Sequence, residues 1–206
     1  MTGPENVFEQ NWQEYCDQLA GINYQNVMDT LGLISDGDRL LLPFFTNQYV
    51  VSHNDIVDVE GRRPDYTAFV IMIKYLLLCP DQAYSDPEWV AFRDFKRTSH
   101  FTNVNFFSSD TERAIEKHFS GRLEELAKAG CLLGGVEHET DMTYDLSMHF
   151  QALPRISLLL LFNDGDDEFP AKCTVLFQRH AELYLDPESL AMTGAVLARS
   201  LRDAFC

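Results

Sequence analysis

The stretch "ISLLLLFNDGDDEFPAKCTVLF", residues 156–177, constrains the fold more than any other part of the chain. It opens with an apolar run and closes with a second one, "TVLF". Between them, the five positions from Asp164 to Glu168 hold four carboxylates and one glycine. Aspartate and glycine between apolar runs are typical of hairpin turns, because both tolerate the backbone that a tight turn requires. The stretch therefore predicts two adjacent antiparallel strands joined by an acidic turn in solvent.

A second interpretation makes this acidic turn a metal or catalytic site. Its carboxylates are Asp164, Asp166, Asp167 and Glu168. A calcium loop of the EF-hand type needs ligands at alternating positions and a distal glutamate, and this turn has neither. We therefore favour the solvated turn and predict no metal ligands. With His149 or His180, which lie in or beside predicted strands, the turn remains the basis for an alternative function as a metal-dependent or acid/base hydrolase.

Helical and strand-like periodicities alternate along the rest of the chain. Apolar residues recur at helical spacing in five segments, 8–19, 24–31, 66–77, 108–130 and 187–205. Turn residues separate strand-like runs into a three-stranded meander over 36–61 and further strands over 131–138, 142–150 and 181–185.

Local signals set some of the expected helix ends. Asp86 followed by Pro87 predicts a short helix, with "WVAF" as a strand the alternative. Ser109 and Glu112 have capping-box spacing at the start of the fourth helical segment, and Gly130 is expected to end it.

The order of these segments predicts an α+β fold. We expect antiparallel sheets, a buried central helix at 66–77 and helices packed on one side. With 206 residues the chain can bury a sizeable core, so residues 1–206 are interpreted as a single α+β domain. A subdivision near residue 130 is the alternative.

Charge and hydropathy argue against nucleic-acid and membrane partners. The net charge of −16 repels phosphates and anionic lipids. The most apolar long segment, 69–79, is too short to span a bilayer, and the N-terminal ten residues lack the basic and apolar regions of a signal peptide. The five cysteines contain no Cys-x-x-Cys pair, which predicts neither a disulfide framework nor a zinc site. We expect a soluble protein of the reducing cytoplasm.

Basic residues are scarce, so those beside apolar segments are candidates for binding an anion. Arg155 opens the most hydrophobic strand, and Arg62 precedes the central helix. Three more stand among phenylalanines in "FRDFKRTSHF", namely Arg93, Lys96 and Arg97. The simpler interpretation of that stretch is an amphipathic segment with its phenylalanines inward. Guanidinium groups bind carboxylates and phosphates through paired hydrogen bonds, so these side chains would form a basic pocket if they converge.

The C-terminal third, "ALPRISLLLLFNDGDDEFPAKCTVLF" and "AELYLDPESLAMTGAVLA", resembles a family known only as a domain of unknown function, found in anaerobic bacteria and archaea. "IMIKYLLL" and "EWVAFRDF" fit the middle of the family pattern, so the resemblance covers residues 20–200. The sequence departs from the pattern at Gln178, where an acidic residue is expected. Some relatives carry an iron–sulfur module in a setting of corrinoid and one-carbon metabolism. The resemblance therefore implies a cofactor-linked or accessory role, although these cysteines lack cluster spacing.

The function that these observations favour is a binding or accessory protein that holds a small anionic ligand, a cofactor or a partner protein. The sequence contains no nucleophile elbow, phosphate loop or dinucleotide fingerprint, so no reaction and no particular cofactor is assigned. The hydrolase based on the acidic turn is one alternative. A protein–protein interaction module is the other.

Overall fold

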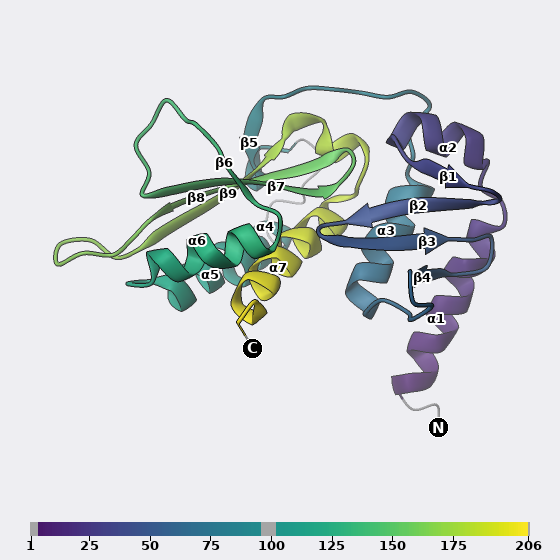
Figure 1. Ribbon diagram of the computed structural model, residues 1–206, viewed down its shortest axis with the longest axis horizontal. Helices are drawn as coiled ribbons and strands as arrows, with labels where there is room; N and C mark the ends of the chain where they lie inside the picture. The colour runs from purple at the N-terminus through teal and green to yellow at the C-terminus, as the bar shows by residue number, and fades with distance from the viewer. Residues whose placement is uncertain (1–3, 96–101, 206) are drawn as a thin grey trace.

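The chain folds into two antiparallel sheets with helices packed against them (Figure 1). The computed structural model describes residues 4–95 and 102–205. Antiparallel strands and separate groups of helices confirm the predicted α+β fold. Within the described ranges, no helix combines the length and the apolar character that crossing a bilayer requires.

The first sheet is a meander in chain order. Its strands are β1 (Ile34–Asp36), β2 (Arg39–Phe44), β3 (Asn47–Val51) and β4 (Ile56–Asp58). The sequence predicts three of these strands, whereas β1 is additional. Its residues come before the turn at Gly37, whose φ of 67° suits glycine, and they pair with the start of β2. A strand this short carries no periodicity of its own.

Three helices pack around this first sheet, namely α1 (Pro4–Leu19), α2 (Tyr24–Leu31) and α3 (Tyr66–Leu77). Two of these helices begin at a residue whose side chain accepts a backbone N–H group. Asn23 caps α2 and Asp65 caps α3, each through the N–H three residues ahead. Gly32, with φ of 74°, ends α2 in the left-handed region.

Helix α3 connects the half of the molecule that surrounds the first sheet, residues 4–58, to the C-terminal half. Seven of its twelve residues are buried, and Phe69 stacks on Trp12 of α1 with ring centroids 3.6 Å apart. The helix contacts α1, β2 and the C-terminal helix α7 (Pro187–Asp203). The buried apolar side chains of both halves form one hydrophobic cluster. Helix α3 is therefore stabilised by burial on nearly every side, as its apolar sequence requires.

The second sheet has the strand order β5-β9-β8-β7-β6. Its strands are β5 (Trp89–Ala91), β6 (Val136–Glu137), β7 (Leu146–Leu153), β8 (Ile156–Asn163) and β9 (Lys172–Gln178). Strand β8 lies in the middle and is buried along all but its last residue. Helices α4 (Thr102–Phe107), α5 (Arg113–Phe119), α6 (Leu123–Leu132) and α7 gather on one side of this sheet (Figure 1).

The single helix predicted over 108–130 is wrong in two respects. Helix α4 begins upstream and continues through a π-helical segment, Ser108–Glu112, into α5. Ser109 is therefore not a cap, and its hydroxyl donates to the carbonyl of Phe106 at 3.1 Å. Gly121, with φ of 72°, then separates α5 from α6.

Gly130 does not end this helical region either. It lies buried inside α6, which continues to Leu132, and a Cβ at this position would collide with the side chain of Met148 on β7. The glycine here allows α6 to approach the sheet closely, rather than allowing the chain to turn.

Two further local predictions are corrected by long-range contacts. The segment after Pro87 forms strand β5, the stated alternative, because Trp89–Ala91 pair with β9. The predicted strand over 181–185 is a 3₁₀ turn, Arg179–Leu183. The hydroxyl of Tyr184 binds both the N–H and the carbonyl of Tyr84, which holds this segment against the connection that precedes β5.

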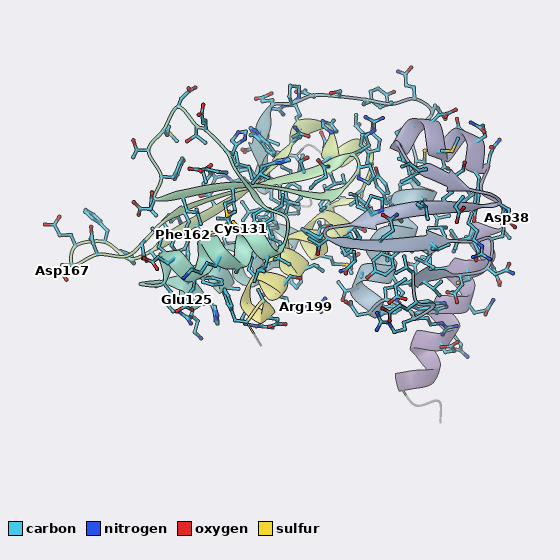
Figure 2. All side chains as sticks on the ribbon, in the orientation of Figure 1. Asp38, Glu125, Cys131, Phe162, Asp167 and Arg199 are labelled. Carbon is cyan, nitrogen blue, oxygen red and sulfur yellow. The ribbon has the colours of Figure 1, made fainter. Side chains whose placement is uncertain are left out.

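The β8–β9 hairpin predicted from the acidic stretch is present. Asn163 pairs with Lys172 at its end, and the loop between them projects beyond the helices. Asp167 lies at the far tip of this loop (Figure 2).

Candidate functional site

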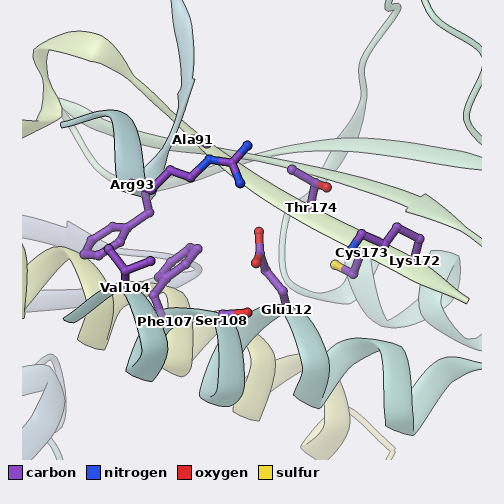
Figure 3. Close-up of a pocket in the computed structure, with 10 residues that line it drawn as sticks. Ala91, Arg93, Val104, Phe107, Ser108, Glu112, Lys172, Cys173 and Thr174 are labelled. Carbon is purple, nitrogen blue, oxygen red and sulfur yellow. The ribbon is translucent and has the colours of Figure 1, made fainter. Parts of the chain in front are cut away.

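A pocket of about 230 Å³ opens beside strand β9, between the 3₁₀ turn Phe92–Asp94 and the helical stretch formed by α4 and the π-helical segment (Figure 3). It is lined by Ala91, Phe92, Arg93, Val104, Phe107, Ser108, Glu112, Lys172, Cys173 and Thr174. One wall is apolar and aromatic, while the remaining side chains are charged, carry hydroxyl groups or, at Cys173, carry a thiol. This mixture is typical of sites for small molecules.

The pocket lies where β9 becomes a free sheet edge. Strand β5 pairs only with the last residues of β9, so the N–H groups of Cys173 and Val175 have no strand partner on that side. Glu116 accepts the N–H of Cys173 at 2.9 Å, and Glu112 accepts that of Val175 at 3.2 Å. Two carboxylates of the adjacent helix thus satisfy backbone donors that would otherwise be buried without a partner.

The π-helical segment determines where Glu112 points. A π turn contains one more residue than an α turn, so it changes the direction of the side chains that follow it. Gly194 of α7 lies against this segment, and a Cβ there would come within 2.5 Å of Phe107 and 2.8 Å of the Thr111 hydroxyl. Close packing on α7 therefore supports the wall of the pocket from behind. Short π-helical turns occur frequently at functional sites.

Burial controls the chemistry of the two titratable groups at the base of the pocket. Burial raises the pKa of Glu112, although the Val175 N–H and the positive charges of Lys172 and Arg93 oppose this. Burial also raises the pKa of the Cys173 thiol well above its usual value, with Glu112 and Glu116 adding to the effect. The Cys173 thiol therefore resists ionisation, and the Glu112 carboxyl keeps its proton to a higher pH than an exposed glutamate does.

Of the predicted anion-binding residues that the structure describes, Arg93 is the one that lines this pocket. Its side chain extends over the opening, towards Glu112 and Thr174 (Figure 3). Among the residues that the structure describes, its ion-pair partner is the neighbouring Asp94, at 4.0 Å. Lys96 and Arg97 lie outside the described residues.

The other two predicted arginines do not converge with Arg93. Arg155 is half-buried, and its Nε donates to the carbonyl of Thr30 at 3.2 Å, while its backbone N–H donates to the hydroxyl of Tyr75 at 3.0 Å. It therefore links the β7–β8 turn to α2 and α3. Arg62 is exposed and pairs with Asp58 and Glu60 beside β4, at 2.7 and 2.9 Å.

The acidic turn uses part of its charge to hold its own backbone. Asp164 accepts the N–H of Gly121 at 2.7 Å, which fastens the base of the loop to the break between α5 and α6. Asp166 accepts the N–H groups of Phe169 and Glu168 at 2.7 and 2.8 Å, and these bonds lower its pKa. Asp166, Asp167 and Glu168 are exposed.

The two histidines considered together with the acidic turn, His149 and His180, have different surroundings. His180 is buried, and its Nδ1 lies 3.0 Å from the backbone nitrogen and 2.8 Å from the carbonyl oxygen of Asp86. His149 instead lies near His138, with ring centroids 6.3 Å apart, and Trp89 contacts both rings. Within the described ranges, no three histidine, cysteine or acidic side chains are grouped closely enough to hold a metal ion.

Glu112, Ser108 and Thr174 are among the pocket residues that the sequence did not indicate as site residues. Glu112 was interpreted as part of a capping box, which is a local role, whereas its partner Val175 lies 63 residues away. Nothing in the sequence around Glu112 signals a partner that distant.

The fold and the pocket define an α+β protein with a small charged site at the edge of an antiparallel sheet. The family model of a domain of unknown function, DUF3786, matches residues 23–200, and the chain belongs to this family. The match extends from the start of α2 into α7 and so includes the whole pocket. No curated protein and no solved structure matches the chain.

Proposed function

We propose that this protein is a binding or accessory protein that holds a small anionic molecule in the pocket beside β9. The observation that carries the proposal is the position of Arg93, whose guanidinium extends over a pocket with an aromatic wall. A guanidinium group binds a carboxylate or phosphate through two parallel hydrogen bonds. The aromatic wall would then contact an apolar part of the same molecule.

The polar groups around Arg93 support this assignment. The hydroxyls of Ser108 and Thr174 line the pocket, and each can donate a hydrogen bond to an anion. Lys172 adds a second positive charge at the rim, although its Nζ lies 3.9 Å from Glu116. Glu112 in the pocket and Glu116 beside Lys172 place negative charge here, so attraction of an anion would depend on direct contact with Arg93 and the hydroxyl donors.

The compartment is part of the proposal. Cys16, Cys79, Cys131 and Cys173 are free thiols. Free thiols are typical of reducing compartments, so we place the binding function in the cytoplasm. We do not extend the proposal to the hydrolase based on the acidic turn, because its exposed carboxylates face solvent rather than a cavity.

Thermal-shift measurements with an anion panel test this function. The panel contains inorganic phosphate, 4-methylpentanoate and 3-phenylpropanoate, and at least one of them is expected to raise the melting temperature of the wild type. Arg93→Ala should remove this rise. Arg62→Ala is the matched control, because both side chains are largely exposed, at 76% and 69%, and Arg62 is not among the residues that line the pocket. Equal rises in the two variants would refute the assignment.

A further inference from the structure

We infer that the ligand of this pocket is a zwitterion of amino-acid size, with a carboxylate bound by Arg93, an ammonium group bound by Glu112 and an apolar body. The inference rests on the proposed function and specifies the ligand class. It starts from the opposed charges of Arg93 and Glu112, which come from different elements and face one another across the pocket (Figure 3). Of the contacts formed by described residues, none is a direct ion pair between these two side chains.

Among the described residues, only one oxygen of the Glu112 carboxylate accepts a hydrogen bond from the protein. Its Oε1 accepts the N–H of Val175, and within the described part of the chain Oε2 accepts no hydrogen bond. The Glu112 carboxylate is half-buried and so partly withdrawn from water, and this burial raises its pKa. An ammonium group at Oε2 would supply the missing counter-charge and a charge-assisted hydrogen bond.

Glu112, together with Arg93, also disfavours ligands that carry only one of the two charges. A molecule with only a carboxylate would gain from Arg93 but would place its charge near a second carboxylate, which is repulsive at short range. A molecule with only an amine would leave Arg93 without an anion. Specificity for a zwitterion therefore arises from repulsion of the alternatives as well as from attraction of the ligand.

The size and lining of the pocket limit the rest of the molecule. A volume of about 230 Å³ suits a single amino acid better than a nucleotide or a peptide. Phe92, Phe107 and Val104 form the apolar wall, so the side chain of the ligand should be aliphatic or aromatic.

Isothermal titration calorimetry with matched probes tests the inference. Leucine is compared with 4-methylpentanoate, which lacks the amine, and with 3-methylbutylamine, which lacks the carboxylate. Phenylalanine, 3-phenylpropanoate and phenethylamine form a second set with an aromatic body. In at least one set, the amino acid is expected to bind about tenfold or more tightly than either partial analogue, the ratio that about 1.4 kcal/mol of added interaction produces.

Glu112→Gln is the decisive variant, because glutamine keeps the shape and an acceptor for the Val175 N–H while removing the charge. It should weaken amino-acid binding by about tenfold and leave the carboxylate analogue unchanged or tighter. Glu116→Gln is the matched control, since Glu116 accepts the neighbouring Cys173 N–H but does not line the pocket. Equal binding of the amino acid and its carboxylate analogue overturns the zwitterion and leaves anion binding intact. Failure of every probe, including phosphate, overturns both.

Discussion

Glu112 of the π-helical segment accepts the backbone N–H of Val175 on the free edge of β9, at a distance of 3.2 Å. This bond joins a helix to a sheet edge across 63 residues of sequence, and it places a half-buried carboxyl group at the base of the pocket. The same side chain thus protects an exposed strand edge and provides the charge that we assign to ligand selection.

The stability of the protein should depend on the ionisation of Glu112. Because burial raises its pKa in the folded state, the folded protein binds this proton more tightly than the unfolded chain does. The resulting stability is complete below the pKa of the unfolded carboxyl and is lost as pH rises through the folded pKa. Glu112→Gln should therefore gain stability relative to wild type between about pH 4 and pH 8, by less than about 1 kcal/mol because solvent partly screens the charge.

Urea denaturation of both proteins at the two pH values measures this difference. Glu124→Gln, an exposed carboxyl on α6, is the control for the change in net charge. A stability difference between Glu112→Gln and wild type that stays constant with pH would contradict the assignment.

Gly194 should be intolerant of even one added methyl group. Its Cβ in Gly194→Ala would lie 2.5 Å from the Phe107 ring and 2.8 Å from the buried hydroxyl of Thr111, so the π-helical segment would have to move. We expect a loss of about 1–3 kcal/mol in the free energy of unfolding, together with weaker ligand binding. Gly130→Ala is the comparison, because its clash is with the flexible end of Met148 and should cost less. Equal losses in the two variants, measured by urea denaturation, would show that the π-helical segment adapts.

Arg155 should contribute to the stability of the fold and not to the binding of an anion. Arg155→Ala removes the hydrogen bond to the Thr30 carbonyl and the packing against Gly32, so we expect a loss of about 1–2 kcal/mol. The melting-temperature rise caused by any bound anion should remain. Arg62→Ala, at an exposed position, should change the stability by no more than about 0.5 kcal/mol. An anion response that disappears with Arg155 would show that the site lies there instead.

Substitutions at Asp166 and Asp167 should have different effects on stability, although the two residues are neighbours in the acidic turn. Asp166→Ala removes the acceptor of two backbone N–H groups and should destabilise the loop, whereas Asp167→Asn should stay within about 0.5 kcal/mol of wild type. Because the pKa of Asp166 is lowered in the folded state, its contribution should be present at neutral pH and be lost as pH falls through the folded pKa.

Denaturation curves of both variants at neutral and acidic pH measure these effects. The Asp166→Ala deficit should shrink in acid. A larger effect at Asp167 than at Asp166 would instead indicate that the tip of the turn has a partner within the protein.

Local patterns predicted the elements whose residues interact mainly with near neighbours. Helices α2 and α7 follow from apolar residues at helical spacing, and the β8–β9 hairpin follows from its own turn residues. The predictions failed where a distant partner decides the conformation. Trp89–Ala91 form a strand only because β9 lies beside them, and the break at Gly121 is held by Asp164 from the acidic turn.

The pocket residues likewise include one that the sequence could predict and one that it could not. Arg93 could be selected as an anion-binding residue because a basic side chain among phenylalanines is visible in the sequence. Glu112 could not, because its role depends on a free strand edge that exists only after β5 pairs with a part of β9.

By itself, the sequence determined the fold class, the buried character of α3 and the acidic hairpin, because spacing and turn residues act over a few positions. The tertiary structure alone decided which charges meet. Arg62, Arg93 and Arg155 were equal candidates along the chain, and packing brought Arg93 to Glu112 while giving the other two partners of their own. The physical reason is that electrostatic interactions depend on distance in space, which chain order does not specify.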